Sequence, residues 1–142
     1  MTNIYLDIDG VLLDKGSASY GATKFIKYVT SNFPDSTYWL TTRCSGDAEA
    51  TVNQIKQYFD ADTVSHLSTI KPTSWPIVKT QAIDLSQPFL WFDDTLGWAD
   101  KQKLEENNVL DNLILIDLTK NPAQLAQLVN DFPLPADFAR HV

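Results

Sequence analysis

The chain of 142 residues is poor in cysteine and in long apolar runs, and each shortage excludes a class of protein. Its single cysteine, Cys44, cannot form an internal disulfide, which is typical of a reducing compartment, and it excludes a zinc site built from cysteines. No apolar run approaches the roughly 20 residues that span a bilayer. Residues 1–5 lack the basic and apolar regions of a signal peptide. We therefore expect a cytoplasmic protein without a membrane partner.

Glycine and proline are also scarce, at five and seven residues, which excludes collagen-like and low-complexity chains. Hydrophobic residues make up 44% of the chain, enough to bury a core of ordinary size. The net charge of −7 weighs against duplex nucleic acid as a partner, because the phosphate backbone would be repelled. We expect one globular domain spanning residues 1–142.

Signatures of several common enzyme classes are missing. There is no Gly-x-Ser-x-Gly run, which excludes the usual serine hydrolase nucleophile turn. Gly16 and Gly21 have the spacing of a P-loop, but Ala22 and Thr23 stand where that loop needs Lys and Ser or Thr. The two histidines, His66 and His141, are too far apart for a recognisable zinc-ligand spacing.

Two pairs of aspartates are the most informative feature that is present. Asp7 and Asp9 follow a short apolar run, and Asp93 and Asp94 follow another. Buried parallel strands deliver side chains into a ligand crevice at their carboxyl ends. Four carboxylates converging there would repel one another unless a divalent cation lay among them, and an all-oxygen ligand set suits Mg²⁺ best. The sequence therefore predicts a magnesium site.

The rest of the chain alternates between strand-like and helix-like segments. Helical apolar spacing occurs between the first strands, for example at Phe25, Ile26 and Val29. Such alternation is typical of a parallel sheet with helical crossovers. We predict an α/β fold, a Rossmann-like domain of three layers with a mainly parallel five-stranded sheet. The expected strands are 3–8, 37–42, 62–66, 89–93 and 112–117. Helical spacing recurs at Val52, Ile55, Tyr58 and Phe59, and further helices are expected around 75–84, 98–107 and 121–131.

In this order, the motifs resemble those of the haloacid dehalogenase-like phosphohydrolases, a Rossmann-like superfamily with four short motifs. The run Asp-Ile-Asp-Gly-Val that begins at Asp7 resembles the first motif, and Thr41 resembles the second. Lys79, which lies 14 residues before Asp93, resembles the third motif. Asp93 and Asp94 resemble the fourth. The resemblance covers most of the chain, although only about ten positions are diagnostic.

The resemblance implies a role for each of these residues. Asp7 would attack phosphorus and form an aspartyl-phosphate, and Asp9 would serve as general acid and base. Mg²⁺ would be held by Asp7, by the backbone carbonyl of Asp9 and by Asp94, with Asp93 in contact directly or through water. Phosphate binding would fall to Thr41 and Lys79.

Three assignments have competitors nearby in the sequence. Thr42 competes with Thr41, because adjacent strand residues face opposite sides of a sheet. We prefer Thr41 because family members commonly show Thr, one small residue and then Arg. Lys71 competes with Lys79, which we prefer because it lies in a helical pattern that leads into the strand before Asp93. Arg43 remains open between the mouth of the site and an ordinary surface position.

The spacing leaves no room for the cap domain that many members of this family insert. Between Asp9 and Thr41 there are 31 residues, and between Thr41 and Lys79 there are 37. No sizeable cap is expected, so the open site favours a macromolecular phosphorylated substrate, or a lid provided by a second copy in a homo-oligomer or by a partner protein.

The predicted function is that of a Mg²⁺-dependent phosphatase that hydrolyses phosphate monoesters. One alternative is a 5′-nucleotidase-like activity on nucleoside monophosphates, with Trp75 or Trp98 stacking on the base. The other is a noncatalytic binding module that keeps the fold and the metal site. Retention of both Asp7 and Asp9 favours an enzyme over this module.

Overall fold

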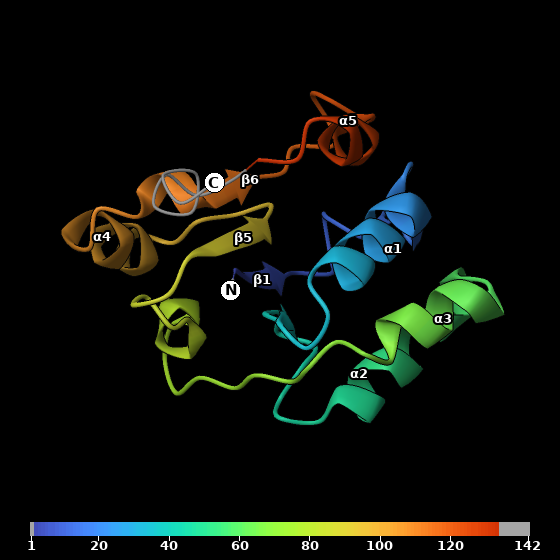
Figure 1. Cartoon of the computed structure of the whole chain (residues 1–142), viewed down its shortest axis with the longest axis horizontal. Helices are drawn as coiled ribbons and strands as arrows, with labels where there is room; N and C mark the ends of the chain where they lie inside the picture. The colour runs from blue at the N-terminus through green and yellow to red at the C-terminus, as the bar shows by residue number, and fades with distance from the viewer. Residues whose placement is uncertain (1, 134–142) are drawn as a thin grey trace.

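The computed structural model describes residues 2–133, and a four-stranded sheet lies at its centre with the strand order β4-β1-β5-β6 (Figure 1). The strands are β1 (Asn3–Leu6), β4 (Thr37–Trp39), β5 (Phe89–Asp93) and β6 (Leu113–Leu115). Every pairing in this sheet is parallel. A separate antiparallel hairpin joins β2 (Leu13–Asp14) to β3 (Ser17–Ala18). The predicted α/β fold with a mainly parallel sheet is confirmed.

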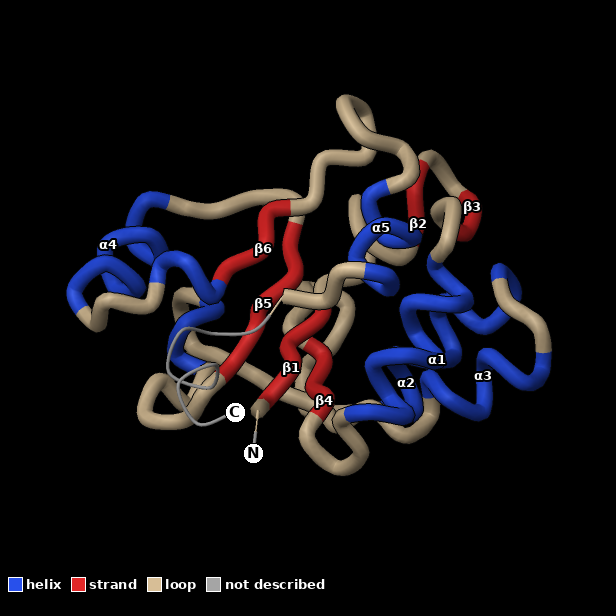
Figure 2. The backbone as a smooth tube through the Cα atoms, turned by 45° about the horizontal axis from the view of Figure 1, so that its top comes forward, coloured by secondary structure: helices blue, strands red, loops and turns tan. Residues whose placement is uncertain are grey.

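Helices cover both faces of the sheet (Figures 1 and 2). On one face, α1 (Ala22–Asn32), α2 (Ala48–Ile55), α3 (Ala61–Leu67) and α5 (Gln124–Asn130) contribute to one apolar core. The other face carries a smaller core with α4 (Trp98–Glu106) and the residues beside the 3₁₀ turn η2 (Lys79–Ala82). Two further 3₁₀ turns, η1 (Lys56–Tyr58) and η3 (Leu110–Asn112), complete the described elements. Within residues 2–133 no helix is long and apolar enough to cross a membrane.

Strand β5 shows why its sequence is continuously apolar. Leu90 and Phe92 pack into the core beside α1, whereas Phe89 and Trp91 pack into the core beside α4. All four are buried, because β5 lies between β1 and β6 with helices on both sides. Strand β6 lies beside β5 at the edge of the sheet, and its residues are only partly buried or exposed.

The expected strand at 62–66 is wrong, because this segment lies within α3. Thr63 and Val64 favour a strand by propensity, but the side chain of Asp60 accepts a hydrogen bond from Thr63 N at 2.7 Å and caps the helix. The sheet of the described residues accordingly has four strands and not five. On the outer side of β4, where a fifth strand would pair, Lys71 forms an isolated parallel bridge with Tyr38.

The helix expected at 75–84 is also wrong over most of its length. Only the four residues of η2 are helical there. Pro76 disfavours helical dihedral angles at Trp75, and Val78 and Ile83 have extended backbones on the two sides of η2. The helices expected around 98–107 and 121–131 are present as α4 and α5, with small shifts at their ends. The helical spacing at Phe25, Ile26 and Val29 falls in α1, and the next such segment forms α2 and then η1.

Candidate active site and metal centre

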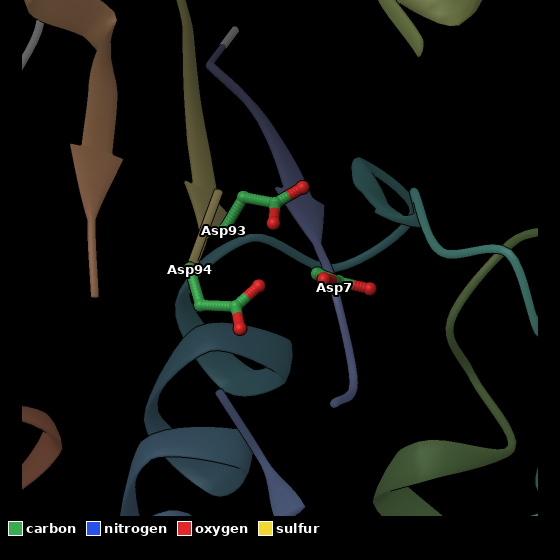
Figure 3. Close-up of side chains that lie close together, drawn as sticks. All are labelled: Asp7, Asp93 and Asp94. Carbon is green, nitrogen blue, oxygen red and sulfur yellow. The ribbon is translucent and has the colours of Figure 1, made fainter. Parts of the chain in front are cut away.

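Three aspartates meet at the carboxyl edge of the sheet. Asp7 directly follows β1, Asp93 is the last residue of β5, and Asp94 comes next (Figure 3). The strands are neighbours, and Asp7 N donates to the carbonyl oxygen of Phe92 at 3.0 Å. One carboxylate oxygen from each of the three aspartates lies within 4.8 Å of the other two. We call these three residues the carboxylate cluster.

Asp93 is the fully buried member of the carboxylate cluster. Its Oδ2 accepts hydrogen bonds from Lys79 Nζ at 2.7 Å and from Trp91 Nε1 at 3.2 Å. Its Oδ1 accepts from Thr95 N at 3.2 Å. Three donors therefore already occupy this carboxylate, which leaves little of its acceptor capacity for anything else.

Lys79 reaches the carboxylate cluster from η2. Its Nζ lies 3.6 Å from Asp7 Oδ2 in addition to its contact with Asp93. Lys71, the competitor from the sequence, lies beyond β4 with its Nζ 5.8 Å from the centroid of the Tyr38 ring. Of the two lysines, the structure brings Lys79 to the aspartates.

The carboxylate cluster carries more negative charge than Lys79 alone offsets. Burial, and then the negative charge of Asp93, raise the pKa of Asp7 to about 7 against the lowering effect of Lys79. Burial, followed by a hydrogen bond with Asp93, also raises the pKa of Asp94. Both shifts report carboxylates that are costly to ionise together, which is the condition that a bound cation relieves.

Gly10 has no side chain, and the side chain of Asp94 occupies the space where a Cβ atom of residue 10 would lie. A Cβ atom at position 10 would lie 2.1 Å from Asp94 Oδ2, and the backbone there has φ +79°. Only glycine meets both conditions without strain. Three carboxylate oxygens in mutual reach and an excess of negative charge form a group that could hold a metal ion, with Asp7 and Asp94 as the carboxylates best able to contact it.

Asp9 lies outside the carboxylate cluster, so the expectation that four acidic side chains converge is wrong. The guanidinium of Arg43 donates from Nε to Asp9 Oδ2 at 2.8 Å and from Nη2 to Asp9 Oδ1 at 2.9 Å. These hydrogen bonds lower the pKa of Asp9. The reason is local: the chain turns after Asp7, where the Ile8 carbonyl accepts from three successive N–H groups, and this turn directs Asp9 to the segment after β4.

The segment after β4 brings Thr41 to the same edge of the sheet. Leu40 N donates to Leu6 O at 2.8 Å, so Thr41 follows β4 as Asp7 follows β1. Thr41 is fully buried, and its Oγ1 accepts from Arg43 N at 3.3 Å. Thr42 is exposed. The structure therefore places Thr41, rather than Thr42, among the buried groups at this edge.

Other candidates from the sequence lie apart from the carboxylate cluster. Trp75 packs in the smaller core, whereas Trp98 is 78% exposed at the start of α4. His66 Nδ1 shares a hydrogen bond with Thr30, and His141 lies outside the described residues. Arg43 is the site residue that the sequence left undecided, and its signal was the Thr-x-Arg spacing after the second strand.

The assembled groups are a buried carboxylate of raised pKa, a lysine beside it, two further carboxylates and a hydroxyl at one sheet edge. They can provide a nucleophile, a cation site and donors to an anion. Comparisons of the chain with protein-family models, with curated proteins and with solved structures found no match.

Proposed function

We propose that this chain is a Mg²⁺-dependent phosphatase of the haloacid dehalogenase-like superfamily, which hydrolyses phosphate monoesters through an aspartyl-phosphate on Asp7. The observation that carries the proposal is the meeting of Asp7 with Asp93, Asp94 and Lys79 at the end of two adjacent parallel strands. This edge of an open α/β sheet is where ligands bind. A phosphatase that uses a carboxylate nucleophile needs this combination of acids and a cation.

Asp7 and Asp94 would hold the ion directly, and Asp93 would act through water because three donors already occupy its oxygens. When bound, Mg²⁺ would neutralise charge on the phosphoryl group and on the carboxylates around it. Lys79, at 3.6 Å from Asp7, favours the ionised and nucleophilic form of that carboxylate.

The chain's own residues divide the reaction into two displacements. An oxygen of Asp7 attacks phosphorus, and the bond from phosphorus to the leaving oxygen breaks. Asp9, once it has left Arg43 and taken up a proton from water, gives that proton to the leaving oxygen. Asp9 then takes a proton from water, which attacks the aspartyl-phosphate and releases inorganic phosphate. Thr41 would donate to a phosphoryl oxygen, since the hydrogen bond recorded at its hydroxyl among the described residues is one that it accepts.

The size of the substrate depends on whether a cap covers the carboxylate cluster. Between Asp9 and Thr41 the chain forms the β2–β3 hairpin, α1 and β4, and between Thr41 and Lys79 it forms α2, η1 and α3. These elements pack on the sheet and its core. We therefore propose a site without a cap, which accepts a phosphorylated macromolecule or is closed by another subunit.

A second candidate is hydrolysis of nucleoside monophosphates. Trp98 favours it, because this side chain is 78% exposed only four positions after Asp94 and offers a face on which a base could stack. A panel of nucleotides, sugar phosphates and phosphopeptides separates the two. A nucleotide preference that Trp98→Ala removes would support this candidate, and turnover of phosphopeptides alone would contradict it.

The first test is hydrolysis of p-nitrophenyl phosphate with Mg²⁺, with excess EDTA, and by the Asp7→Asn variant. We expect EDTA to abolish activity and Asp7→Asn to lower kcat by at least about 10³-fold, since the nucleophile is lost. Asp111→Asn is the matched control, because Asp111 is exposed before β6, at the opposite edge of the sheet. Normal turnover by Asp7→Asn would overturn the proposal, and Mg²⁺ binding without turnover of any ester would favour the binding module instead.

A further inference from the structure

Arg43 is fixed at its backbone and extended at its side chain. Its carbonyl oxygen accepts from Gln54 Nε2 at 2.9 Å, and its N–H donates to Thr41 Oγ1 at 3.3 Å. These two contacts tie the residue between α2 and the carboxyl edge of the sheet. The guanidinium, by contrast, is attached through a flexible stem and pairs only with Asp9 among the described residues. The backbone of Arg43 is therefore held in place, while its guanidinium can change partners.

The ion pair between Arg43 and Asp9 lies on the solvent side of the site. The side chain of Arg43 is 31% exposed and that of Asp9 is 59% exposed, whereas Lys79 is 16% exposed. Lys79 is also already engaged by Asp93 at 2.7 Å and lies close to Asp7. An anion that enters from solvent would thus meet the guanidinium before it meets the lysine.

Arg43 also lies within electrostatic reach of the nucleophile. Its pKa is raised mainly by the hydrogen bonds to Asp9, and the charge of Asp7 adds to the shift. It is the one arginine in residues 2–133. A guanidinium has a planar fork of donors that matches two phosphoryl oxygens as well as it matches a carboxylate. The same two donors that now hold Asp9 are therefore suited to a phosphate.

We propose that Arg43 binds the phosphoryl group of the substrate and exchanges Asp9 for two phosphoryl oxygens when the substrate enters. This inference rests on the proposed function, and it adds a substrate-binding residue to it. The exchange leaves no buried charge unpaired, because the guanidinium passes from one anion to another and the exposed carboxylate of Asp9 is rehydrated. Asp9 then becomes free for proton transfer only when a phosphate is in place.

The experiment measures binding of inorganic phosphate to the Mg²⁺-loaded protein by isothermal titration calorimetry, which requires no turnover. We expect Arg43→Met to weaken phosphate binding by about 10- to 100-fold, because charge-assisted hydrogen bonds are lost. Arg43→Lys keeps the charge without the fork and should give an intermediate loss, and melting curves will show that both variants fold. Lys103→Met, on the exposed face of α4, is the control for removal of one positive charge and should not change the affinity.

A second experiment tests whether Asp9 and phosphate compete for Arg43. Asp9→Asn should tighten phosphate binding by about 3- to 10-fold when Arg43 is present, and by less in the Arg43→Met background. Equal tightening in both backgrounds would mean that Asp9 acts by general repulsion, and it would overturn the exchange.

The outcomes separate this inference from the proposed function. Unchanged phosphate affinity in Arg43→Met, with normal hydrolysis in the wild type, would overturn the role of Arg43 and leave the phosphatase standing. Absence of phosphate binding by the wild-type protein would also overturn it. Arg43-dependent phosphate binding without hydrolysis of any ester would instead sustain the anion site and contradict the phosphatase.

Discussion

Gly10 and Asp94 compete for the same space at the edge of the sheet. A Cβ atom on residue 10 would come within 2.1 Å of Asp94 Oδ2, and φ +79° is a region that other residues enter at a cost. We predict that Gly10→Ala destabilises the protein by about 1–3 kcal/mol and weakens Mg²⁺ binding, because Asp94 must move. Chemical denaturation and Mg²⁺ titration by calorimetry measure the two effects.

Gly16 provides the matched control for this substitution. It has φ +82°, close to that of Gly10, but a Cβ atom there would meet nothing within 4 Å. Gly16→Ala should carry the backbone cost alone and leave Mg²⁺ affinity unchanged. Equal Mg²⁺ affinity in the two variants would show that Asp94 does not depend on the space at Gly10.

Asp7 makes the stability of the metal-free protein depend on pH. Its pKa is raised to about 7 in the folded state, above the value of about 3.9 for an unfolded chain. Folding thus favours the protonated form, so the contribution of this group to stability is complete below about pH 4 and is lost as the pH rises through about 7. We predict that Asp7→Asn raises the melting temperature of the EDTA-treated protein at pH 8 by a few degrees.

Melting temperatures measured between pH 5 and pH 8 test this prediction. The gain from Asp7→Asn should shrink between pH 8 and pH 5, since the wild-type carboxyl becomes protonated in the folded protein over that range. Asp111→Asn, at an exposed position, should leave the melting temperature unchanged at every pH. A loss of stability in Asp7→Asn at pH 8 would contradict the prediction.

At the scale of elements, a hydrogen-bonded contact between α4 and η2 positions Lys79. Oδ1 of the buried Asp100 accepts from Thr80 N at 3.0 Å and from Thr80 Oγ1 at 2.8 Å. Thr80 is the neighbour of Lys79, so this contact fixes the short turn that carries the lysine. A turn of four residues has little stability of its own and depends on such contacts.

We predict that Asp100→Ala lowers the free energy of unfolding by about 1–3 kcal/mol, because two buried donors of Thr80 lose their acceptor. It should also raise the KM for an aryl phosphate severalfold through displacement of Lys79. The measurement is a double-mutant cycle with Thr80→Val, in which the two substitutions should not be additive. Asp111→Ala is the control and should stay within about 0.5 kcal/mol of the wild type; additive effects would contradict the coupling.

In two short segments the local sequence suggests the wrong secondary structure. Thr63 and Val64 are β-branched and resemble a strand, yet the cap from Asp60 and the packing of Leu67 in the larger core make α3 a helix. Lys79 is placed correctly beside Asp93 although the helix expected to carry it is only a 3₁₀ turn. Propensity is a weak guide in short segments, because tertiary contacts outweigh it.

At the scale of the whole molecule, a cation at the carboxylate cluster should stabilise the fold. A ligand that binds only the folded state at 100 times its Kd adds about 2.7 kcal/mol. We predict that saturating Mg²⁺ raises the melting temperature by about 3–10 °C at pH 8 and that EDTA reverses the rise. The shift should disappear in Asp94→Asn and persist in Asp111→Asn. A Mg²⁺ shift of equal size in both variants would place the ion elsewhere.

Much of this molecule was determined by sequence alone. The apolar run at 89–92 and the alternation of strands and helices predicted a parallel α/β sheet, because a strand buried on both faces must be apolar throughout. The acids that follow two such strands predicted a carboxylate cluster at one edge, since adjacent parallel strands end together.

Only the tertiary structure decided which partner each of these side chains meets. It separated Asp9 from the carboxylate cluster and paired it with Arg43, and it placed Lys71 away from the aspartates. It also made the expected strand at 62–66 part of the helix α3. The physical reason is that side-chain partners are set by turns and by contacts between distant segments. Asp9 and Arg43 are 34 positions apart, and no local pattern records which donor a carboxylate meets.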